Sequence, residues 1–180
     1  FTGTSISFEE IQRYKNKGGL NNDWDLTEAI IKTKGKSVNK KKIIKKFQNY
    51  YSNLINNEKW LLNKRILKSL FKRYNLAILT GRPRKEAYSV LKRNKITNCF
   101  NTIVAMEDIP KQKPNPDGIL KILNKSSNSY AYYFGDSIDD MKAAFLANIS
   151  PVGVLPPQDK SALLRNLLIK NGAKKVIPDI

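Results

Sequence analysis

Residues 130–141 read YAYYFGDSIDDM, and this stretch decides the fold that the sequence predicts. It begins as an apolar, aromatic run, which is typical of a buried strand. The chain then turns at Gly135 and delivers three carboxylates, Asp136, Asp139 and Asp140. Apolar residues follow at helical spacing, at Met141, Ala144, Phe145 and Ala147. Open α/β sheets bind ligands at the carboxyl ends of their strands, and this stretch has the form of such an end.

The three carboxylates allow two interpretations. Like charges gathered at one strand end repel one another unless a cation lies between them. Mg²⁺ fits such a place, because it accepts one or two carboxylate ligands and keeps several waters. Alternatively, the carboxylates simply occupy the first turn of a helix, where the helix dipole stabilises negative charge. The stretch by itself leaves both interpretations open.

Strands and helices alternate through most of the chain beyond residue 73. Short apolar runs predict further strands at residues 76–80, 102–106, 149–154 and 176–177. Helical spacing predicts helices between them, over residues 87–91, 119–123 and 163–168. Asn115 is the expected N-cap of the second of these helices, with Pro116 at its first position. The alternation predicts an α/β fold with a parallel, Rossmann-like sheet and right-handed crossovers.

The front of the chain is predicted to be helical throughout. Residues 7–10, SFEE, form a capping box that opens a short helix ending near Tyr14. Residues 21–24, NNDW, are expected to form a loop before a second capping signal, DLTE. Strong helical spacing then continues over two further runs, residues 43–55 and 60–71. The sequence therefore predicts two domains, a helical domain over residues 1–63 and an α/β domain over residues 64–180.

The composition excludes several classes of catalysis. The 180 residues contain no histidine and one cysteine, Cys99, so Ser-His-Asp and Cys-His catalysis, internal disulfides and cysteine-rich zinc sites are excluded. Acid–base or metal chemistry must then rest on Asp, Glu, Lys or hydroxyl groups. We find no apolar run of about 18 residues and no secretory signal. These features predict a cytoplasmic protein with no membrane partner.

The charge of the chain is strongly basic, with 33 Lys and Arg against 15 Asp and Glu, a net charge of +18. Such a balance permits binding to nucleic acid or steering of anionic substrates. The lysines are nevertheless scattered, and the densest tract, residues 32–46, lacks the interleaved aromatics that stack on bases. We therefore favour a general compositional bias over a nucleic-acid partner. Nothing in the sequence indicates an oligomeric state.

Polar side chains follow three of the predicted strands. Thr80 ends one strand, Lys113 follows the next, and Asp136 and Asp140 follow the third. Singly, each has a simpler explanation: Thr80 caps a turn, and Lys113 is one more surface lysine. Together, a hydroxyl, an ammonium and a metal-binding carboxylate pair at one sheet edge suit a phosphate group.

At these residues the sequence resembles the haloacid dehalogenase superfamily of phosphohydrolases, in particular its phosphoglycolate-phosphatase-like branch with an inserted helical cap. The matching segments are residues 76–84 (LAILTGRPR), 113–116 (KPNP) and 134–140 (FGDSIDD). The resemblance implies that the helical front is the cap. It also implies a Mg²⁺-dependent phosphomonoester hydrolase that acts through an aspartyl-phosphate on a small phosphorylated metabolite.

The same resemblance implies roles for individual residues. The phosphate-binding residues would be Thr80, Gly81, Arg82 and Lys113, and the catalytic residues Thr80, Lys113 and Asp136. Mg²⁺ would be bound by Asp136 with Asp140, and Asp139 is the second choice for the latter. From the cap, the loop at residues 21–24 would reach the substrate through Asn22 and Trp24, although a contact between cap and core explains them equally well.

One departure from the family concerns the nucleophile, which belongs to a DxD motif at the end of the first strand. Asp23-Trp24-Asp25 has the letters but follows no apolar strand. We therefore expect the chain to be incomplete, with a missing strand that ends in DxD and lies between the strands at residues 76–80 and 131–134. The alternative is a catalytically inactive module that binds anions or nucleic acid.

Overall fold

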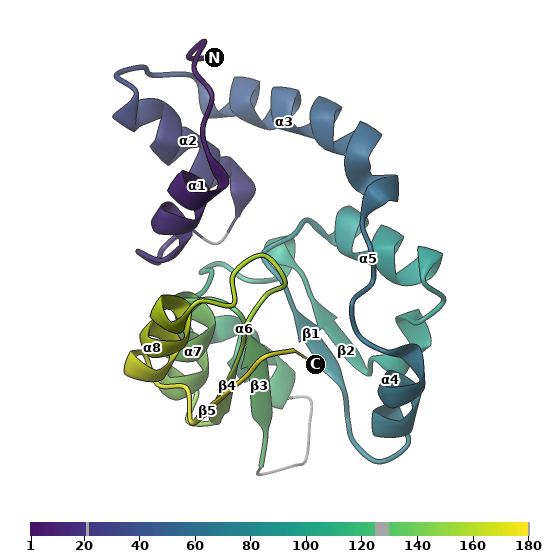
Figure 1. Cartoon of the computed structure of the whole chain (residues 1–180). Helices are drawn as coiled ribbons and strands as arrows, with labels where there is room; N and C mark the ends of the chain where they lie inside the picture. Colours follow the sequence, from purple (N-terminus) through teal and green to yellow (C-terminus); the bar gives the residue numbers. More distant parts are fainter. Residues whose placement is uncertain (21, 125–129, 180) are drawn as a thin grey trace. The chain divides into compact units, whose positions relative to one another are not determined.

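The computed structural model describes residues 1–20, 22–124 and 130–179, which form two compact units, Phe1–Lys59 and Trp60–Ile180 (Figure 1). The division falls after Lys59, whereas the sequence placed the boundary after Asn63. Asn21, which belongs to the loop predicted at residues 21–24, lies outside the described residues. Each unit is described by itself below.

The first unit is helical, as predicted. It contains α1 (Phe8–Lys15), α2 (Asp23–Thr33), α3 (Lys40–Leu54) and the 3₁₀ helix η1 (Ile55–Asn57). Each α-helix begins at a residue whose side-chain oxygen accepts a backbone N–H of the first turn, namely Ser7, Asn22 and Asn39. The predicted cap at Ser7 is confirmed by a bond of 3.1 Å from the backbone N–H of Glu10.

The prediction of a loop that ends at Trp24 was wrong, because α2 begins at Asp23. Asn22 is the N-cap, and its Oδ1 accepts the backbone N–H of Asp25 at 2.8 Å. Two capping signals compete in this segment, and the earlier one starts the helix. Asp23 and Asp25 then both lie in the first turn, where the helix dipole favours them.

The second unit alternates strands and helices. Its elements are α4 (Lys64–Phe71), β1 (Ala77–Leu79), α5 (Arg84–Arg93), η2 (Thr97–Cys99), β2 (Thr102–Val104), η3 (Met106–Asp108), α6 (Asp117–Leu123), β3 (Tyr132–Gly135), α7 (Ile138–Leu146), β4 (Ser150–Val154), α8 (Ala162–Lys170) and β5 (Lys175–Ile177). In Figure 1, α4 and α5 accompany β1 and β2, whereas α7 and α8 accompany β3, β4 and β5. The predicted α/β fold is confirmed.

All strand pairs among the described residues are parallel, and they form two sheets. β1 pairs with β2, with Ile78 opposite Ile103, and β3, β4 and β5 form a second sheet in that order. Phe134 of β3 lies opposite Val152 of β4. β1 and β3 are therefore edge strands of two separate sheets within the same unit.

A shared layer of side chains connects the two sheets. Ile119 of α6 packs with the alanines of α7, Ala143, Ala144 and Ala147. Leu79 of β1 and Tyr133 of β3 both pack against this cluster. The edge strands of both sheets thus lie on the same pair of helices, α6 and α7.

The prediction of a fully buried strand at β3 was wrong. Tyr132 is 70% exposed and Phe134 is 52% exposed, while the intervening Tyr133 packs against the α6–α7 cluster. Alternation of this kind is typical of a strand that is covered on one face. In α7, Met141, Ala144 and Ala147 are buried as predicted, but Phe145 is 68% exposed.

Helix α6 begins one residue later than predicted. Pro116 is its N-cap, and the side chain of Asn115 instead accepts the backbone N–H of Asp117 at 3.0 Å. The peptide bond between Lys113 and Pro114 is cis. A search of the described residues found no helix with both the length and the apolar character that a bilayer crossing requires.

Candidate functional site

The side chains predicted to bind phosphate or Mg²⁺ follow three strands in the second unit. Thr80 directly follows β1, Lys113 lies in the loop between η3 and α6, and Asp136 directly follows β3. The structure brings Lys113 against Asp140 of α7, with 2.6 Å between Nζ and Oδ1. Lys113 and Asp140 are thus two predicted site residues that the structure brings into direct contact.

The ion pair is buried, since the side chains of Lys113 and Asp140 are 12% and 5% exposed. The hydroxyl of Tyr133 donates to the same Oδ1 atom of Asp140 at 3.0 Å, and it accepts from Lys113 Nζ at 3.4 Å. Nζ also lies 6.0 Å from the centroid of the Tyr133 ring. Three polar groups from three segments of the chain therefore form one closed cluster.

Ser137 binds the other oxygen of Asp140. Asp140 Oδ2 accepts the backbone N–H of Ser137 at 3.1 Å and its hydroxyl at 2.7 Å. The backbone N–H of Asp140 in turn donates to Ser137 Oγ at 3.1 Å, which completes a capping box at the start of α7. These reciprocal hydrogen bonds pair the backbone N–H groups of Ser137 and Asp140 at the start of α7.

This arrangement bears on the prediction that Asp140 binds a metal. A carboxylate has about four acceptor positions, and Asp140 receives two donors on each oxygen. A direct bond to a metal would have to displace one of these contacts. The arrangement fits support of the site through Lys113 rather than direct ligation. Asp139, the second choice, is 3% exposed and lies inside α7.

The pKa values of the cluster follow from its burial and its charges. Burial by itself lowers the pKa of the Lys113 ammonium, but the Asp140 carboxylate and Tyr133 outweigh it, so the pKa lies above its usual value. Burial by itself raises the pKa of Asp140, but Lys113 and the surrounding donors lower it below its usual value. Burial, with the Asp140 charge, raises the pKa of the Tyr133 phenol. At neutral pH the cluster holds one ammonium, one carboxylate and one neutral phenol.

Gly135 makes room for Asp140. A Cβ atom at Gly135 would lie 2.4 Å from Asp140 Cβ and 2.5 Å from its Cγ, far inside van der Waals contact. The turn after β3 therefore depends on a residue without a side chain.

We expect Gly135→Ala to push Asp140 away from Ser137 and Lys113 and to lower the free energy of unfolding by about 1–3 kcal/mol, as overpacking does. Urea denaturation of the variant and the wild-type protein measures the difference. An unchanged unfolding midpoint would show that the Asp140 side chain can relocate without cost.

Asp136 is the strand-end carboxylate that the sequence predicts to bind the metal. Its side chain is exposed, and it directly follows β3. No cluster of three or more acidic, His or Cys side chains that could hold a metal ion occurs within residues 1–20, 22–124 and 130–179. Mg²⁺ nevertheless needs only one or two carboxylates, because water and substrate oxygens complete its shell. The donor chemistry of Asp136 fits such an ion.

Thr80 has the local contact that its simpler explanation predicts. Its Oγ accepts the backbone N–H of Arg82 at 3.1 Å, so the hydroxyl stabilises the turn at Gly81. The backbone N–H of Thr80 donates to Val104 O at 3.0 Å and extends the pairing of β1 with β2. Its predicted contact with phosphate stays a prediction.

The loop after β1 is tied to the loop after β2. The carbonyl of Arg82 accepts the backbone N–H of Met106 at 3.1 Å. Glu107 Oε2 accepts the backbone N–H of Arg84 at 2.8 Å and so caps α5, while the Arg84 guanidinium pairs with Asp108. These contacts fix the backbone of Gly81 and Arg82, two predicted phosphate-binding residues.

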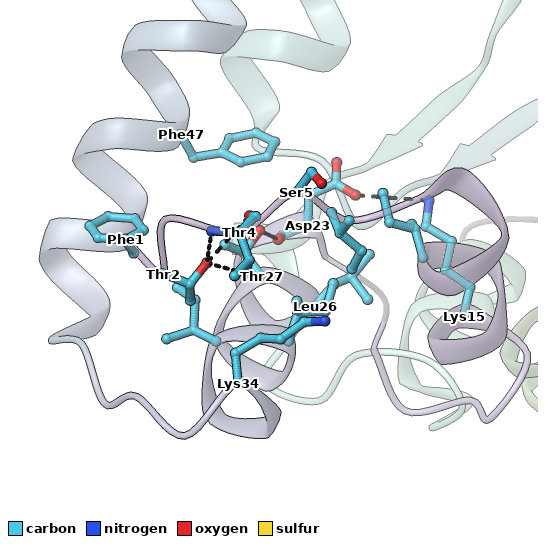
Figure 2. Close-up of a pocket in the computed structure, with 14 residues that line it drawn as sticks. Phe1, Thr2, Thr4, Ser5, Lys15, Asp23, Leu26, Thr27, Lys34 and Phe47 are labelled. Carbon is cyan, nitrogen blue, oxygen red and sulfur yellow. Dashed lines mark hydrogen bonds and ion pairs between the residues drawn. The ribbon is translucent and has the colours of Figure 1, made fainter.

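The first unit contains a separate pocket of about 330 Å³. Its apolar wall includes Ile11, Leu26, Ile30, Ile31 and Phe47. Figure 2 shows Lys15 and Asp23 at this pocket, where their charged groups lie 3.9 Å apart. Asp23 lines the pocket, but Asn22 and Trp24, the predicted substrate-binding residues, do not. Their contact with a substrate stays a prediction.

The sequence analysis did not identify three features of the site: the contacts of Tyr133, the contacts of Ser137, and the room that Gly135 leaves for Asp140. The Ser137 contact had a signal, because S-x-x-D before an apolar run is a capping pattern. Tyr133 had no such signal. Residues 130–133 include three tyrosines, and the sequence does not reveal which of them faces the helices.

Comparisons with known proteins show what this chain is similar to. The family model described as haloacid dehalogenase-like hydrolase matches residues 7–154. An imidazoleglycerol-phosphate dehydratase of Phytophthora nicotianae is 31% identical over 170 residues, which are 87% of this chain and 37% of that protein. A phosphoglycolate phosphatase of Pseudomonas putida is 28% identical over 81 residues, which are 44% of this chain and 30% of that protein.

The fold has close counterparts among solved structures. A hydrolase from Pseudomonas syringae superimposes with a TM-score of 0.73 at 24% identity, covering 93% of this chain and 78% of that one. At this identity the likeness concerns the fold alone. The matched region spans about a third of the length of the curated relatives, 37% and 30% in the two cases above.

Proposed function

The chain belongs to the haloacid dehalogenase-like hydrolase family, and from that premise we propose that it hydrolyses phosphomonoesters with the help of Mg²⁺. The observation that carries the proposal is the buried Lys113 ammonium, fixed by Asp140 near the carboxyl end of β3. A fixed cation in a region of low dielectric stabilises developing negative charge more strongly than one in water. A phosphoryl group is the substrate feature that needs such stabilisation.

Each predicted residue has a role in this proposal. Lys113 binds a phosphoryl oxygen, together with the Thr80 hydroxyl and the loop at Gly81 and Arg82. Asp136 would hold Mg²⁺, which supplies charge neutralisation on the phosphoryl group when bound. Asp140 affects the substrate only indirectly, by holding the Lys113 ammonium. In this proposal the exposed carboxylate, Asp136, binds the metal, and the buried carboxylate, Asp140, orients the lysine.

We further propose that the nucleophile is an aspartate on a parallel strand that pairs with both β1 and β3 and becomes an aspartyl-phosphate. Among the described residues, β1 pairs only with β2, and β3 only with β4. Their edge strands lie on one shared layer, because Leu79 and Tyr133 pack against the same helices. A strand there would satisfy backbone groups that cost about 1–3 kcal/mol each when buried and unbonded. Asp23 and Asp25 do not have this placement, since both lie in α2 of the first unit.

The proposed substrate is a small phosphorylated metabolite. Two relatives, imidazoleglycerol-phosphate dehydratase and phosphoglycolate phosphatase, are named after such compounds. Asn22 and Trp24, at the start of α2, would contact the part of the substrate that distinguishes one metabolite from another. The metal-independent chemistry of a dehalogenase would leave Asp136 without a role.

Phosphate release from a panel of phosphorylated metabolites, with and without Mg²⁺, tests the proposal. Release that depends on Mg²⁺ for at least one small phosphomonoester is expected of the protein that carries this chain. Absence of release from every compound would contradict it and favour the inactive, anion-binding alternative, which the comparisons do not support.

Neutralising the basic start of α3 separates those two possibilities. Lys41 and Lys42 are exposed there, and Lys40 pairs with Asp25. We expect Lys40→Gln, Lys41→Gln and Lys42→Gln together to leave turnover unchanged, because this surface only adds to the general positive charge. The wild-type protein should bind nucleic acid weakly, with an affinity that falls steeply with salt and shows no sequence preference.

A filter-binding titration at two salt concentrations measures this. The Lys41→Gln, Lys42→Gln pair is the matched control, because it spares the Lys40–Asp25 contact. Tight binding at physiological salt that discriminates between sequences, and is lost in the triple variant, would favour the binding module.

A further inference from the structure

Tyr133 is the residue of the candidate site whose role the proposed function leaves open. It is the second residue of β3, and its hydroxyl lies 3.0 Å from Asp140 Oδ1 and 3.4 Å from Lys113 Nζ. The phenol therefore links the strand β3, the loop before α6 and the first turn of α7. Its hydroxyl acts in both directions, donating to the carboxylate and accepting from the ammonium.

The backbone of β3 directs this hydroxyl inward. Tyr132 and Phe134 alternate with Tyr133, and both are more than half exposed. On the inner face, the ring of Tyr133 packs beside Ala143, Ala144 and Ala147, whose small side chains leave room for it. The ring is thus fixed by packing, and its hydroxyl is fixed by two hydrogen bonds.

A lysine needs such a support if it is to bind a phosphoryl oxygen at a defined point. Its ammonium is a compact charge on a flexible four-carbon stem, so a single ion pair does not fix its direction. The carboxylate of Asp140 supplies one contact, and the Tyr133 hydroxyl supplies a second from a different direction. A misplacement of about 1 Å at a reacting group can reduce a rate 100-fold.

We propose that Tyr133 is a positioning residue, which holds the Lys113 ammonium through its hydroxyl in the orientation that binds the phosphoryl group. The catalytic consequence rests on the proposed function, whereas the support of Lys113 does not. Tyr133→Phe tests the role, because it keeps the ring and removes only the hydroxyl. Tyr132→Phe is the matched control, since that hydroxyl belongs to an exposed side chain on the same strand.

The first readout is the hydrogen-exchange rate of the Lys113 ammonium, followed by NMR in protein labelled at its lysine side chains. In the wild-type protein, this ammonium should exchange on the order of tenfold more slowly than that of Lys142, which is exposed on α7. Tyr133→Phe should speed the exchange at Lys113, although the Asp140 pair and burial still slow it, and Tyr132→Phe should leave it unchanged. Exchange at Lys113 as fast as at Lys142 in the wild-type protein would overturn the proposal without any variant.

The second readout is kinetic, on the protein that carries this chain with its Mg²⁺. Tyr133→Phe should lower kcat/KM for a phosphomonoester about tenfold, the loss expected for one hydrogen bond to a charged group. In a Lys113→Met background the same change should have less than about a twofold effect, because the two residues act through one contact. Independent, multiplicative losses would overturn the positioning role.

The two readouts separate this proposal from the proposed function. A protein without Mg²⁺-dependent turnover contradicts the proposed function, and the exchange rates still decide whether Tyr133 holds Lys113. Unchanged exchange at Lys113 in a folded Tyr133→Phe variant contradicts the inference, whether or not phosphate esters are hydrolysed.

Discussion

Replacing Lys113 with methionine is expected to lower the free energy of unfolding by about 3–5 kcal/mol at neutral pH. The substitution keeps an unbranched apolar stem, one atom shorter than lysine, but leaves the Asp140 carboxylate buried without its cation, and that side chain is only 5% exposed. Removal of one partner of a buried ion pair costs much more than the pair contributes, because the remaining charge has lost its solvation.

Urea denaturation of the purified variant measures this loss. The double variant Lys113→Met, Asp140→Asn should recover a large part of it, since no buried charge then remains. Lys142→Met, which removes an exposed lysine of α7, is the control and should change the stability by less than about 0.5 kcal/mol. A loss in Lys113→Met no larger than in this control would contradict a buried, interacting pair.

The pH dependence of the same loss follows from the two shifted pKa values. Asp140 has a lowered pKa, so its contribution is complete above its unfolded value of about 3.9 and is lost as the pH falls through the folded value. Lys113 has a raised pKa, so its contribution is complete below its unfolded value of about 10.4 and is lost only as the pH rises through the folded value. The difference between wild type and Lys113→Met should therefore be largest from about pH 4 to pH 10.

Replacing Asp136 with alanine is expected to reduce Mg²⁺-dependent turnover by at least about 10²-fold, the scale of a lost electrostatic stabiliser at a reacting group. Asp136 is the exposed carboxylate that directly follows β3, where the Mg²⁺ is proposed to bind. The variant should keep the wild-type stability within about 0.5 kcal/mol, because the side chain is at the surface.

Steady-state kinetics over a range of Mg²⁺ concentrations measures the effect. Asp179→Ala, an exposed carboxylate that follows β5, is the control and should leave both turnover and its Mg²⁺ dependence unchanged. Turnover in Asp136→Ala with the wild-type Mg²⁺ dependence would refute the assignment and move attention to Asp139.

The sequence predicted the order of strands and helices because the spacing of apolar residues and the residues that cap or end an element are local properties. The apolar run before Gly135 and the capping residues around it each act within a few residues of their own position. The prediction failed where two local signals competed, as at Asn22 and Asp25, because both are good caps and the choice depends on what the helix packs against. It also failed for the faces of β3, since a strand's orientation is fixed by its neighbours rather than by its own residues.

The sequence predicted residues for the candidate site but not the contacts among them. Thr80, Lys113 and Asp136 were predicted from their places after strands, and the structure adds that Lys113 contacts Asp140 and Tyr133. Residues that act through other side chains leave weak signals in a single sequence, because their role depends on contacts with residues far away in the chain. Ser137 and Gly135 belong to the same class, since both serve the placement of Asp140.

The measurement that tests the central claim most directly is the rate of p-nitrophenyl phosphate hydrolysis by the protein that carries this chain, before and after removal of Mg²⁺ with a chelator. The account predicts turnover that disappears with the chelator, returns when Mg²⁺ is added and falls by at least about 10²-fold in Lys113→Ala. Turnover that continues without a divalent metal, or that Lys113→Ala leaves unchanged, would contradict a Mg²⁺-dependent phosphatase built around Lys113 and Asp136.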